Sequence, residues 1–277
     1  CFAAGIKPGD EVITSPITFA ASANCVLYCG GTPVFADIDK RTYNIDPKDI
    51  RRKITSRTKA IVAVHLAGQP CDMDEIHEIA EENHLIVIED GAHALGSEYK
   101  GKQIGGLSDL TTFSFHPVKP ITTGEGGMIT TNDEVLYQKL LLFRSHGITR
   151  DASLLKKEEG SWYYEQQCLG YNYRITDFQC ALGISQMRKL DRFLERRREL
   201  VRRYDDALKE CEDIITPYQM EGTDSGWHLY IIQVLNHDRK EIFEKLREQG
   251  IGVNVHYIPV YKHPYYQENG YGSVHCE

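Results

Sequence analysis

Two stretches of this sequence carry side chains that could do chemistry, and each follows an apolar run. In "FSFHPVKPITTGEGG", residues 113–127, the only lysine is Lys119, which stands between a run typical of a β-strand and a glycine-rich turn. In "IVIEDGAHALGS", residues 86–97, Asp90 ends an aliphatic run and His93 follows it closely. An amine among apolar groups can have a depressed pKa, and a neutral lysine forms a Schiff base with an aldehyde.

Each of these residues also has a simpler interpretation. Asp90 could cap a helix or form a turn, Lys119 could be a solvated charge, and His93 could be hydrogen-bonded structure. Their combination favours pyridoxal phosphate (PLP), which needs an amine for its aldehyde and a carboxylate that keeps its pyridine nitrogen protonated. Ser114 could bind the cofactor phosphate, and the glycines of residues 123–127 would let the backbone approach closely. No GxGxxG fingerprint or P-loop competes for this site.

The elements that must position these residues alternate between strand and helix through roughly the first 145 residues. The stretches 59–68 and 84–90 are almost continuously apolar, as is typical of strands buried on both faces. Helical patterns occupy residues 17–29, 47–54 and 74–83. This order predicts an α/β fold, with a mainly parallel sheet, helices on both faces and an active site at the carboxyl ends of the strands.

The second half of the chain has a different pattern. Residues 177–209 are predicted to be helical, and two apolar stretches (227–235 and 251–260) flank a helix at 239–249. We therefore expect a large domain at 1–195 and a smaller C-terminal α+β domain at 196–277. The sequence opens without a helix cap and stops without a closing element, so we expect a fragment truncated at both ends.

Composition argues against several other classes of protein. Of 277 residues, 41% are hydrophobic and 26% charged, which is typical of a globular domain, and no apolar run is long enough for a membrane span. The formal charge is -8, and the most basic stretch, 192–203, is interleaved with Glu195 and Glu199. We expect a solvated helix face there, with no nucleic-acid or membrane partner. The 8 cysteines contain no C-x-x-C pair, which favours reduced thiols in the cytoplasm and no metal site.

Four motifs, in their order and spacing, resemble the DegT-type nucleotide-sugar aminotransferases of PLP fold type I. They are "IEDGAHALGS", "FSFHPVKPITTGEGG", "RSHG" (144–147) and "LGYNYRITDFQCALG" (169–183). The resemblance extends from "GIKPGDEVITSPITFAASAN" to "VHYIPVY", essentially the whole chain. It implies the PLP-dependent transferase fold type I.

The resemblance also implies roles for residues around the cofactor. Lys119 would bind the cofactor aldehyde and then move a proton. Asp90 would pair with the pyridine nitrogen, and His93 would lie near the phenolic oxygen. Phe19 of "TFAAS" falls where the family stacks an aromatic ring on the pyridine.

Two further residues are assigned to the phosphate by the same resemblance. Ser114 would bind it within one subunit. Asn172 of "GYNYR" would reach the phosphate in the other subunit's site, which implies a homodimer with shared active sites.

The substrate assignment rests on similarity within the family. "SFHPVKPITTGEGG", "WYYEQQCLGYNYRITD" and "VHYIPVY" are most similar to enzymes that aminate UDP-4-keto-6-deoxy-β-L-AltNAc in pseudaminic acid biosynthesis, with L-glutamate as amino donor. The resemblance directs two segments at the sugar nucleotide, and the candidate substrate residues are His146, His256, Tyr257, Ile258 and Pro259. Alternatively, Tyr257 packs in a C-terminal core and His146 caps a helix.

Two other functions remain open from the sequence. One is a catalytically silent PLP-fold protein that acts as a binding module, against which the intact Lys119, Asp90 and Ser114 argue. The other is a different PLP reaction, such as dehydration, or a reaction on a dTDP-sugar. Relatives that remove a hydroxyl carry histidine in place of the lysine, so the presence of Lys119 favours transamination.

Overall fold

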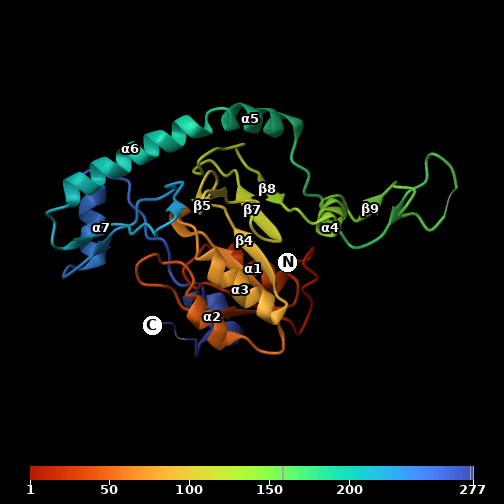
Figure 1. Cartoon of the computed structure of the whole chain (residues 1–277), viewed down its shortest axis with the longest axis horizontal. Helices are drawn as coiled ribbons and strands as arrows, with labels where there is room; N and C mark the ends of the chain where they lie inside the picture. The colour runs from red at the N-terminus through yellow and green to blue at the C-terminus, as the bar shows by residue number, and fades with distance from the viewer. Residues whose placement is uncertain (158, 275, 277) are drawn as a thin grey trace.

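A six-stranded sheet lies at the centre of the molecule, with strand order β2-β1-β3-β4-β7-β8 (Figure 1). The computed structural model describes residues 1–157, 159–274 and 276. The strands of this sheet are β1 (Glu11–Thr14), β2 (Thr32–Phe35), β3 (Thr58–Val64), β4 (Ile86–Asp90), β7 (Leu110–Ser114) and β8 (Gly127–Thr130). All neighbouring pairs are parallel except β7 with β8, which is antiparallel. The predicted mainly parallel α/β sheet is confirmed.

The register of the central strands brings their carboxyl ends to one edge. Val64 of β3 is paired with Asp90 of β4, and Asp90 is paired with Thr112 of β7. Because these strands are parallel, the residues that follow each of them emerge at the same edge of the sheet. Asp90 and the loop that carries Lys119 therefore start from neighbouring positions.

Helices cover both faces of the sheet. The helices before the C-terminal part are α1 (Ala21–Tyr28), α2 (Pro47–Lys53), α3 (Met73–Asn83) and α4 (Glu134–Arg144). Ile61 belongs to a buried cluster with side chains of α2 and α3, whereas its neighbour Val62 belongs to a cluster with side chains of α1 and α4. Successive strand residues point to opposite faces, so the two clusters lie on opposite sides of the sheet. Burial on both faces explains the nearly unbroken apolar runs in the sequence.

The expected long helical stretch consists of two helices, α5 (Asp177–Met187) and α6 (Leu190–Leu208), which run along one side of the molecule (Figure 1). Leu190 and Leu194 of α6 pack against the cluster that contains α2 and α3. A third helix, α7 (Arg239–Glu248), follows. It matches the helix expected at 239–249.

The two apolar stretches that flank α7 contain little strand. Only β13 (Gln233–Val234) forms within 227–235, pairing with β11 (Ile214–Ile215), and residues 251–259 contain no strand. Their backbone groups bond to loops of the large sheet instead. Leu229 donates to the carbonyl of Ala67, and Val260 donates to the carbonyl of Pro16.

Short strand pairs complete the structure. β5 (Glu98–Tyr99), β6 (Lys102–Gln103) and β12 (Thr223–Asp224) form a three-stranded antiparallel sheet. β9 (Ile148–Thr149) pairs with β10 (Glu165–Gln166), in a segment that extends outward beyond α4 (Figure 1). Among the described residues, no helix is both long and apolar enough to cross a membrane.

Candidate active site

Asp90 ends β4, and its carboxylate is held by two hydrogen bonds. The Ser22 hydroxyl of α1 donates to Oδ2 at 2.6 Å, and the backbone N–H of Ala92 donates to Oδ1 at 3.1 Å. Each oxygen thus accepts one protein hydrogen bond and keeps a lone pair for a ligand. Ser22 is buried, and the sequence analysis did not identify it as a site residue.

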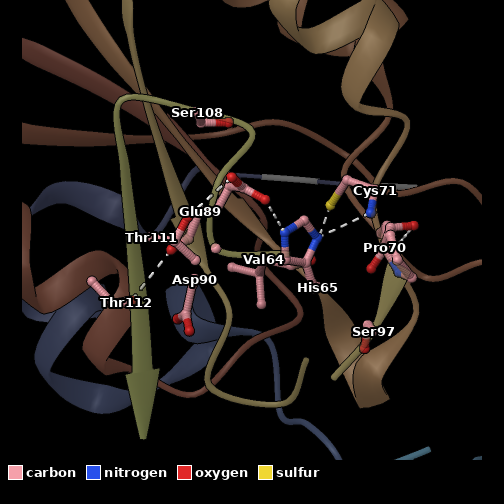
Figure 2. Close-up of polar contacts among 12 residues, drawn as sticks. Val64, His65, Pro70, Cys71, Glu89, Asp90, Ser97, Ser108, Thr111 and Thr112 are labelled. Carbon is pink, nitrogen blue, oxygen red and sulfur yellow. Dashed lines mark hydrogen bonds and ion pairs between the residues drawn. The ribbon is translucent and has the colours of Figure 1, made fainter. Parts of the chain in front are cut away.

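The preceding residue, Glu89, points to the other side of the strand (Figure 2). Its carboxylate accepts hydrogen bonds from the His65 ring at 2.7 Å and from the Thr111 hydroxyl at 3.1 Å. The Cys71 N–H donates to His65 Nδ1, which leaves the ring proton on Nε2, facing Glu89. Burial alone would raise the pKa of Glu89, but the bonds from His65 and Thr111 hold it below its usual range. This pair, also missed in the sequence, fixes β4 from the side opposite Asp90.

Lys119 lies in the loop after β7, where its N–H donates to the carbonyl of His116 at 3.0 Å. Burial lowers the pKa of its half-buried amine, and the negative charge of Asp90 opposes that shift only in part. No hydrogen bond or ion pair of this amine is found in the described part of the chain. Lys119 is therefore close enough to Asp90 for its pKa to be affected by that charge, while the amine remains available to react.

His93 lies beside them and is neutral. The Ala67 N–H donates to its Nδ1 at 3.2 Å, so the ring proton is on Nε2, which lies 3.3 Å from the Tyr257 hydroxyl oxygen. Burial, followed by electrostatic interactions with His228 and Lys119, lowers the pKa of His93 to about 2. The ring can donate one hydrogen bond at Nε2 without carrying charge.

His228 is a second buried histidine of the site that the sequence analysis missed. Its ring centroid lies 4.4 Å from that of His93, and its Nδ1 has no hydrogen-bond partner among the described residues. Burial, then the charge of Lys119, lowers its pKa to about 3. The Arg197 guanidinium donates to the His228 carbonyl at 3.2 Å and holds the segment in place. The sequence feature that could have identified His228 is its position as the only histidine in the apolar run "WHLYIIQVL".

The "VHYIPV" segment brings part of the predicted substrate set to the site. The ring centroids of Tyr257 and Phe19 are 6.5 Å apart, and the Tyr257 hydroxyl contacts His93. Tyr257 therefore does not pack in a separate C-terminal core. His256 lies 4.7 Å from Tyr257, and burial lowers its pKa. Ile258 is 56% exposed, and the Pro259 carbonyl accepts from a backbone N–H of the next turn. The Phe19 ring is 66% exposed, so its face is free for stacking.

Ser114 is the last residue of β7 and precedes the glycine-rich turn. Its hydroxyl oxygen accepts from the His116 N–H at 3.3 Å, and its proton remains available. Gly126 has a φ of +154°, and a Cβ there would lie 2.3 Å from the Thr123 hydroxyl oxygen. Only glycine fits at this position, which fixes the return of the chain into β8.

The remaining predicted residues, Asn172 and His146, make their described contacts near the end of α4. Asn172 forms a β-bridge with Ser145 at the end of α4, and the His146 N–H donates to the Tyr171 carbonyl at 2.6 Å. No described hydrogen bond, ion pair or ring contact joins Asn172 or His146 to the Lys119 region. His146 thus lies just after α4 in a left-handed conformation, with a φ of 61°, and its backbone hydrogen bond connects this end of the helix to Tyr171.

The described residues fit PLP on several independent observations. The amine of Lys119 is unpaired, and Asp90 has lone pairs that can accept from a ring N–H. The buried Nδ1 of His228 lacks a partner, and the ring of Phe19 is exposed beside Tyr257. The fold and this site are those of a PLP-dependent enzyme of the type I fold, and the relatives of the chain give the reaction class.

The chain belongs to the DegT/DnrJ/EryC1/StrS aminotransferase family, whose model matches residues 2–277. It is 46% identical to the spore coat polysaccharide biosynthesis protein SpsC of Bacillus subtilis, covering 96% of this chain and 70% of that protein. It is 42% identical to a UDP-4-amino-4,6-dideoxy-N-acetyl-beta-L-altrosamine transaminase of Campylobacter jejuni, with the same coverage. The Helicobacter pylori PseC structure superposes with a TM-score of 0.87 at 38% identity, covering 94% of this chain and 69% of that one. The chain thus spans about 70% of the length of these relatives.

Proposed function

We propose that this protein transfers an amino group from L-glutamate to a nucleotide-linked 4-keto-6-deoxy sugar. The observation that carries the proposal is the unpaired amine of Lys119, whose pKa is lowered by burial and which is close enough to Asp90 to be affected by its charge. Two neutral histidines, His93 and His228, line the same space. A silent binding protein would not need a reactive amine in this position, which argues for catalysis.

PLP, when bound, supplies an aldehyde that captures amines and a ring that accepts an electron pair. In the proposed roles, the Lys119 amine would hold the cofactor through its aldehyde and would move a proton at the donor carbon. Asp90 would accept from the pyridine N–H, and His93 Nε2 could donate to the phenolic oxygen. Phe19 would stack on the ring, and Ser114 would donate to the phosphate.

For the sugar, we propose UDP-4-keto-6-deoxy-β-L-AltNAc, as in pseudaminic acid biosynthesis. Relatives at 40–42% identity in Campylobacter and Helicobacter carry the corresponding transaminase name. A second candidate is a GDP-linked keto sugar, because a GDP-perosamine synthase of Escherichia coli is 39% identical over 96% of this chain. These identities are similar, so the nucleotide must be settled by assay.

The test is a panel of UDP-, GDP- and dTDP-linked 4-keto-6-deoxy sugars, each incubated with glutamate and PLP-loaded protein. We expect amino-sugar product with the UDP-linked substrate and a kcat/KM at least about tenfold above the others, equal to about 1.4 kcal/mol. Preference for the GDP-linked sugar would select the second candidate. No amino-group transfer to any sugar, with PLP bound, would contradict the proposed function.

We further propose that the sugar nucleotide contacts His146, His256, Tyr257, Ile258 and Pro259. Support comes from the Tyr257 ring, which lies beside the exposed Phe19 ring, and from the His256 ring, which lies against Tyr257. Tyr257→Ala should slow the half-reaction with the sugar more than the half-reaction with glutamate. Equal slowing of both would indicate a general defect of the site and would remove Tyr257 from the substrate set.

The active unit is proposed to be a homodimer in which Asn172 completes the partner's site. Large apolar side chains of α5 and the segment before it are unusually exposed, including Phe178 at 90% and Leu169 at 85%. Monomers rarely leave such patches uncovered. Within its own chain Asn172 makes no described contact with the Lys119 region, which is compatible with a role across the interface.

A further inference from the structure

The turn that leads into α1 places two buried hydroxyl groups behind Asp90. Thr18 is 3% exposed and Ser22 is 4% exposed. Their oxygens lie 2.8 Å apart, and the Ser22 oxygen lies 2.6 Å from Asp90 Oδ2. Between them in sequence, the Phe19 ring points to the exposed side. One short turn therefore carries the proposed stacking ring on one side and a hydroxyl pair on the other.

The direction of these hydrogen bonds follows from the number of protons. An ionised carboxylate only accepts, so the single Ser22 proton is donated to Asp90. The alternative acceptor, the Phe19 carbonyl, is more distant from the Ser22 oxygen, at 3.3 Å. Since the Ser22 proton is used, the Thr18 hydroxyl must be the donor in the contact between the two hydroxyls. The chain of donation runs from Thr18 to Ser22 to Asp90.

This chain has a defined effect on the carboxylate. A hydroxyl that accepts one hydrogen bond becomes a stronger donor in the next, so the bond from Thr18 strengthens the bond from Ser22 to the carboxylate. The Ala92 N–H holds the other oxygen, so the two bonds together fix the plane of the carboxylate. The free lone pairs then point in a constant direction.

We propose that Ser22 and Thr18 are positioning residues that orient the Asp90 carboxylate, so that it can hold the proton on the pyridine nitrogen of PLP. The inference rests on the proposed function, because it assumes that Asp90 is the partner of that nitrogen. Neither hydroxyl needs to touch cofactor or substrate. Their effect is transmitted through the Asp90 carboxylate alone.

The experiment uses protein loaded with PLP that carries an NMR-active nitrogen isotope in its ring. The nitrogen chemical shift is followed against pH, which reports protonation without reference to turnover. In Ser22→Ala, the midpoint for loss of the ring proton should move down by about one pH unit, the scale of a single hydrogen bond to a charged group. Thr18→Val should move it in the same direction by less, whereas Thr18→Ser, which keeps the hydroxyl, should match the wild type.

Two controls separate positioning from general destabilisation. Ser97→Ala removes another buried serine hydroxyl that makes two hydrogen bonds, to Gly68 and Gly226, and should leave the midpoint unchanged. The double variant with Ser22→Ala and Thr18→Val should shift no further than Ser22→Ala, because Thr18 acts through Ser22. If Ser22→Ala fails to bind PLP, the comparison of Thr18→Val with Thr18→Ser still decides.

The outcomes are distinct. A midpoint in Ser22→Ala or Thr18→Val equal to the wild-type value would overturn the relay while leaving the proposed function intact. A wild-type protein whose bound PLP shows an unprotonated ring nitrogen near neutral pH would contradict the role of Asp90 itself. In that case the proposed function and the relay would both fail.

Discussion

The amine of Lys119 is subject to two opposing influences at the sheet edge. Burial lowers its pKa, and the charge of Asp90 raises it, with burial the larger effect. The neighbouring histidines, His93 and His228, are neutral and leave Asp90 as the nearby charge that affects this amine. A larger fraction of the amine is therefore neutral, and able to attack an aldehyde, than for a lysine in water.

Replacing this amine should abolish activity without unfolding the protein. Lys119→Ala should lose the visible absorbance of lysine-bound PLP and at least about a thousandfold in turnover, which is about 4 kcal/mol. Stability should change little, because the side chain makes no hydrogen bond within the described residues. Lys102→Ala, on the exposed strand β6, is the matched control and should behave as wild type. A borohydride-reducible PLP adduct in Lys119→Ala would show that another lysine is the anchor.

At this scale the sequence predicts some site residues and not others. Asp90 and Lys119 are predictable, because polar groups directly after apolar strands converge on one edge of a parallel sheet. Ser22 is not, because its partner Asp90 is 68 positions away and a serine among small helical residues has no distinguishing pattern. His228 is missed for the same reason, since its role depends on packing against the ring of His93.

At the scale of elements, β4 carries two adjacent carboxylates with different tasks. Glu89 is fully buried and bonded to His65 and Thr111, whereas Asp90 faces α1 and the site. The alternation of side chains along a strand separates the two groups. One end of the same strand therefore contributes to both the stability of the sheet and the proposed chemistry.

Conservative amides at these two positions should have opposite consequences. Asp90→Asn should still bind PLP but slow the half-reaction with glutamate at least about a hundredfold, or about 3 kcal/mol, because an amide cannot hold the pyridine proton. Glu89→Gln should instead lower the free energy of unfolding by about 1–3 kcal/mol, since it weakens buried hydrogen bonds to a charged acceptor. Stopped-flow absorbance and urea unfolding of both variants provide the measurements. If the two variants exchanged phenotypes, the division of tasks along β4 would be wrong.

The sequence predicts the elements well where burial imposes a period and poorly where it does not. β4 and the helices α2, α3 and α7 are predicted with nearly the right bounds, because their apolar patterns follow from packing on the sheet. The strand predicted at 59–68 ends earlier, because β3 stops at Val64 and Leu66–Gly68 form a turn of 3-10 helix. Residues 227–232 and 251–259 also have apolar patterns but form no strand. Leu229 and Val260 donate backbone hydrogen bonds to loops of the large sheet instead, and a local pattern does not contain such tertiary contacts.

The whole molecule should lose stability in mild acid because two of its buried histidines, His93 and His228, have depressed pKa values. Both His93 and His228 have depressed pKa values in the folded state, about 2 and about 3. Between an unfolded-state pKa of about 6.5 and these values, the unfolded chain binds more protons than the folded one. This contribution to stability is therefore fully present above a pH of about 6.5. Below it, the free energy of unfolding falls as the pH decreases, by up to about 1.4 kcal/mol per pH unit for each histidine.

Urea unfolding between neutral pH and mild acid measures this slope directly. The two histidines contribute equally to the slope of the free energy of unfolding against pH, because each binds one extra proton on unfolding. His228→Gln should therefore remove about half of their joint contribution. His84→Asn removes an exposed histidine in the left-handed cap of α3, where asparagine is tolerated, and should leave the slope unchanged. A slope in His228→Gln equal to that of the wild type would show that His228 is not held neutral in the fold.

The exposed apolar side chains of α5 and the remote position of Asn172 are explained together if two copies share their sites. Lys119→Ala and Asn172→Ala subunits should each be nearly inactive alone, because every site of a homodimer then lacks one residue. After random mixing, half of the dimers are hybrids and one of their two sites is intact, so about a quarter of wild-type activity should return. Mixing Lys119→Ala with the double variant creates no intact site and is the control. Hybrids confirmed by mass but without activity would show that Asn172 serves its own chain, and the shared site would be rejected.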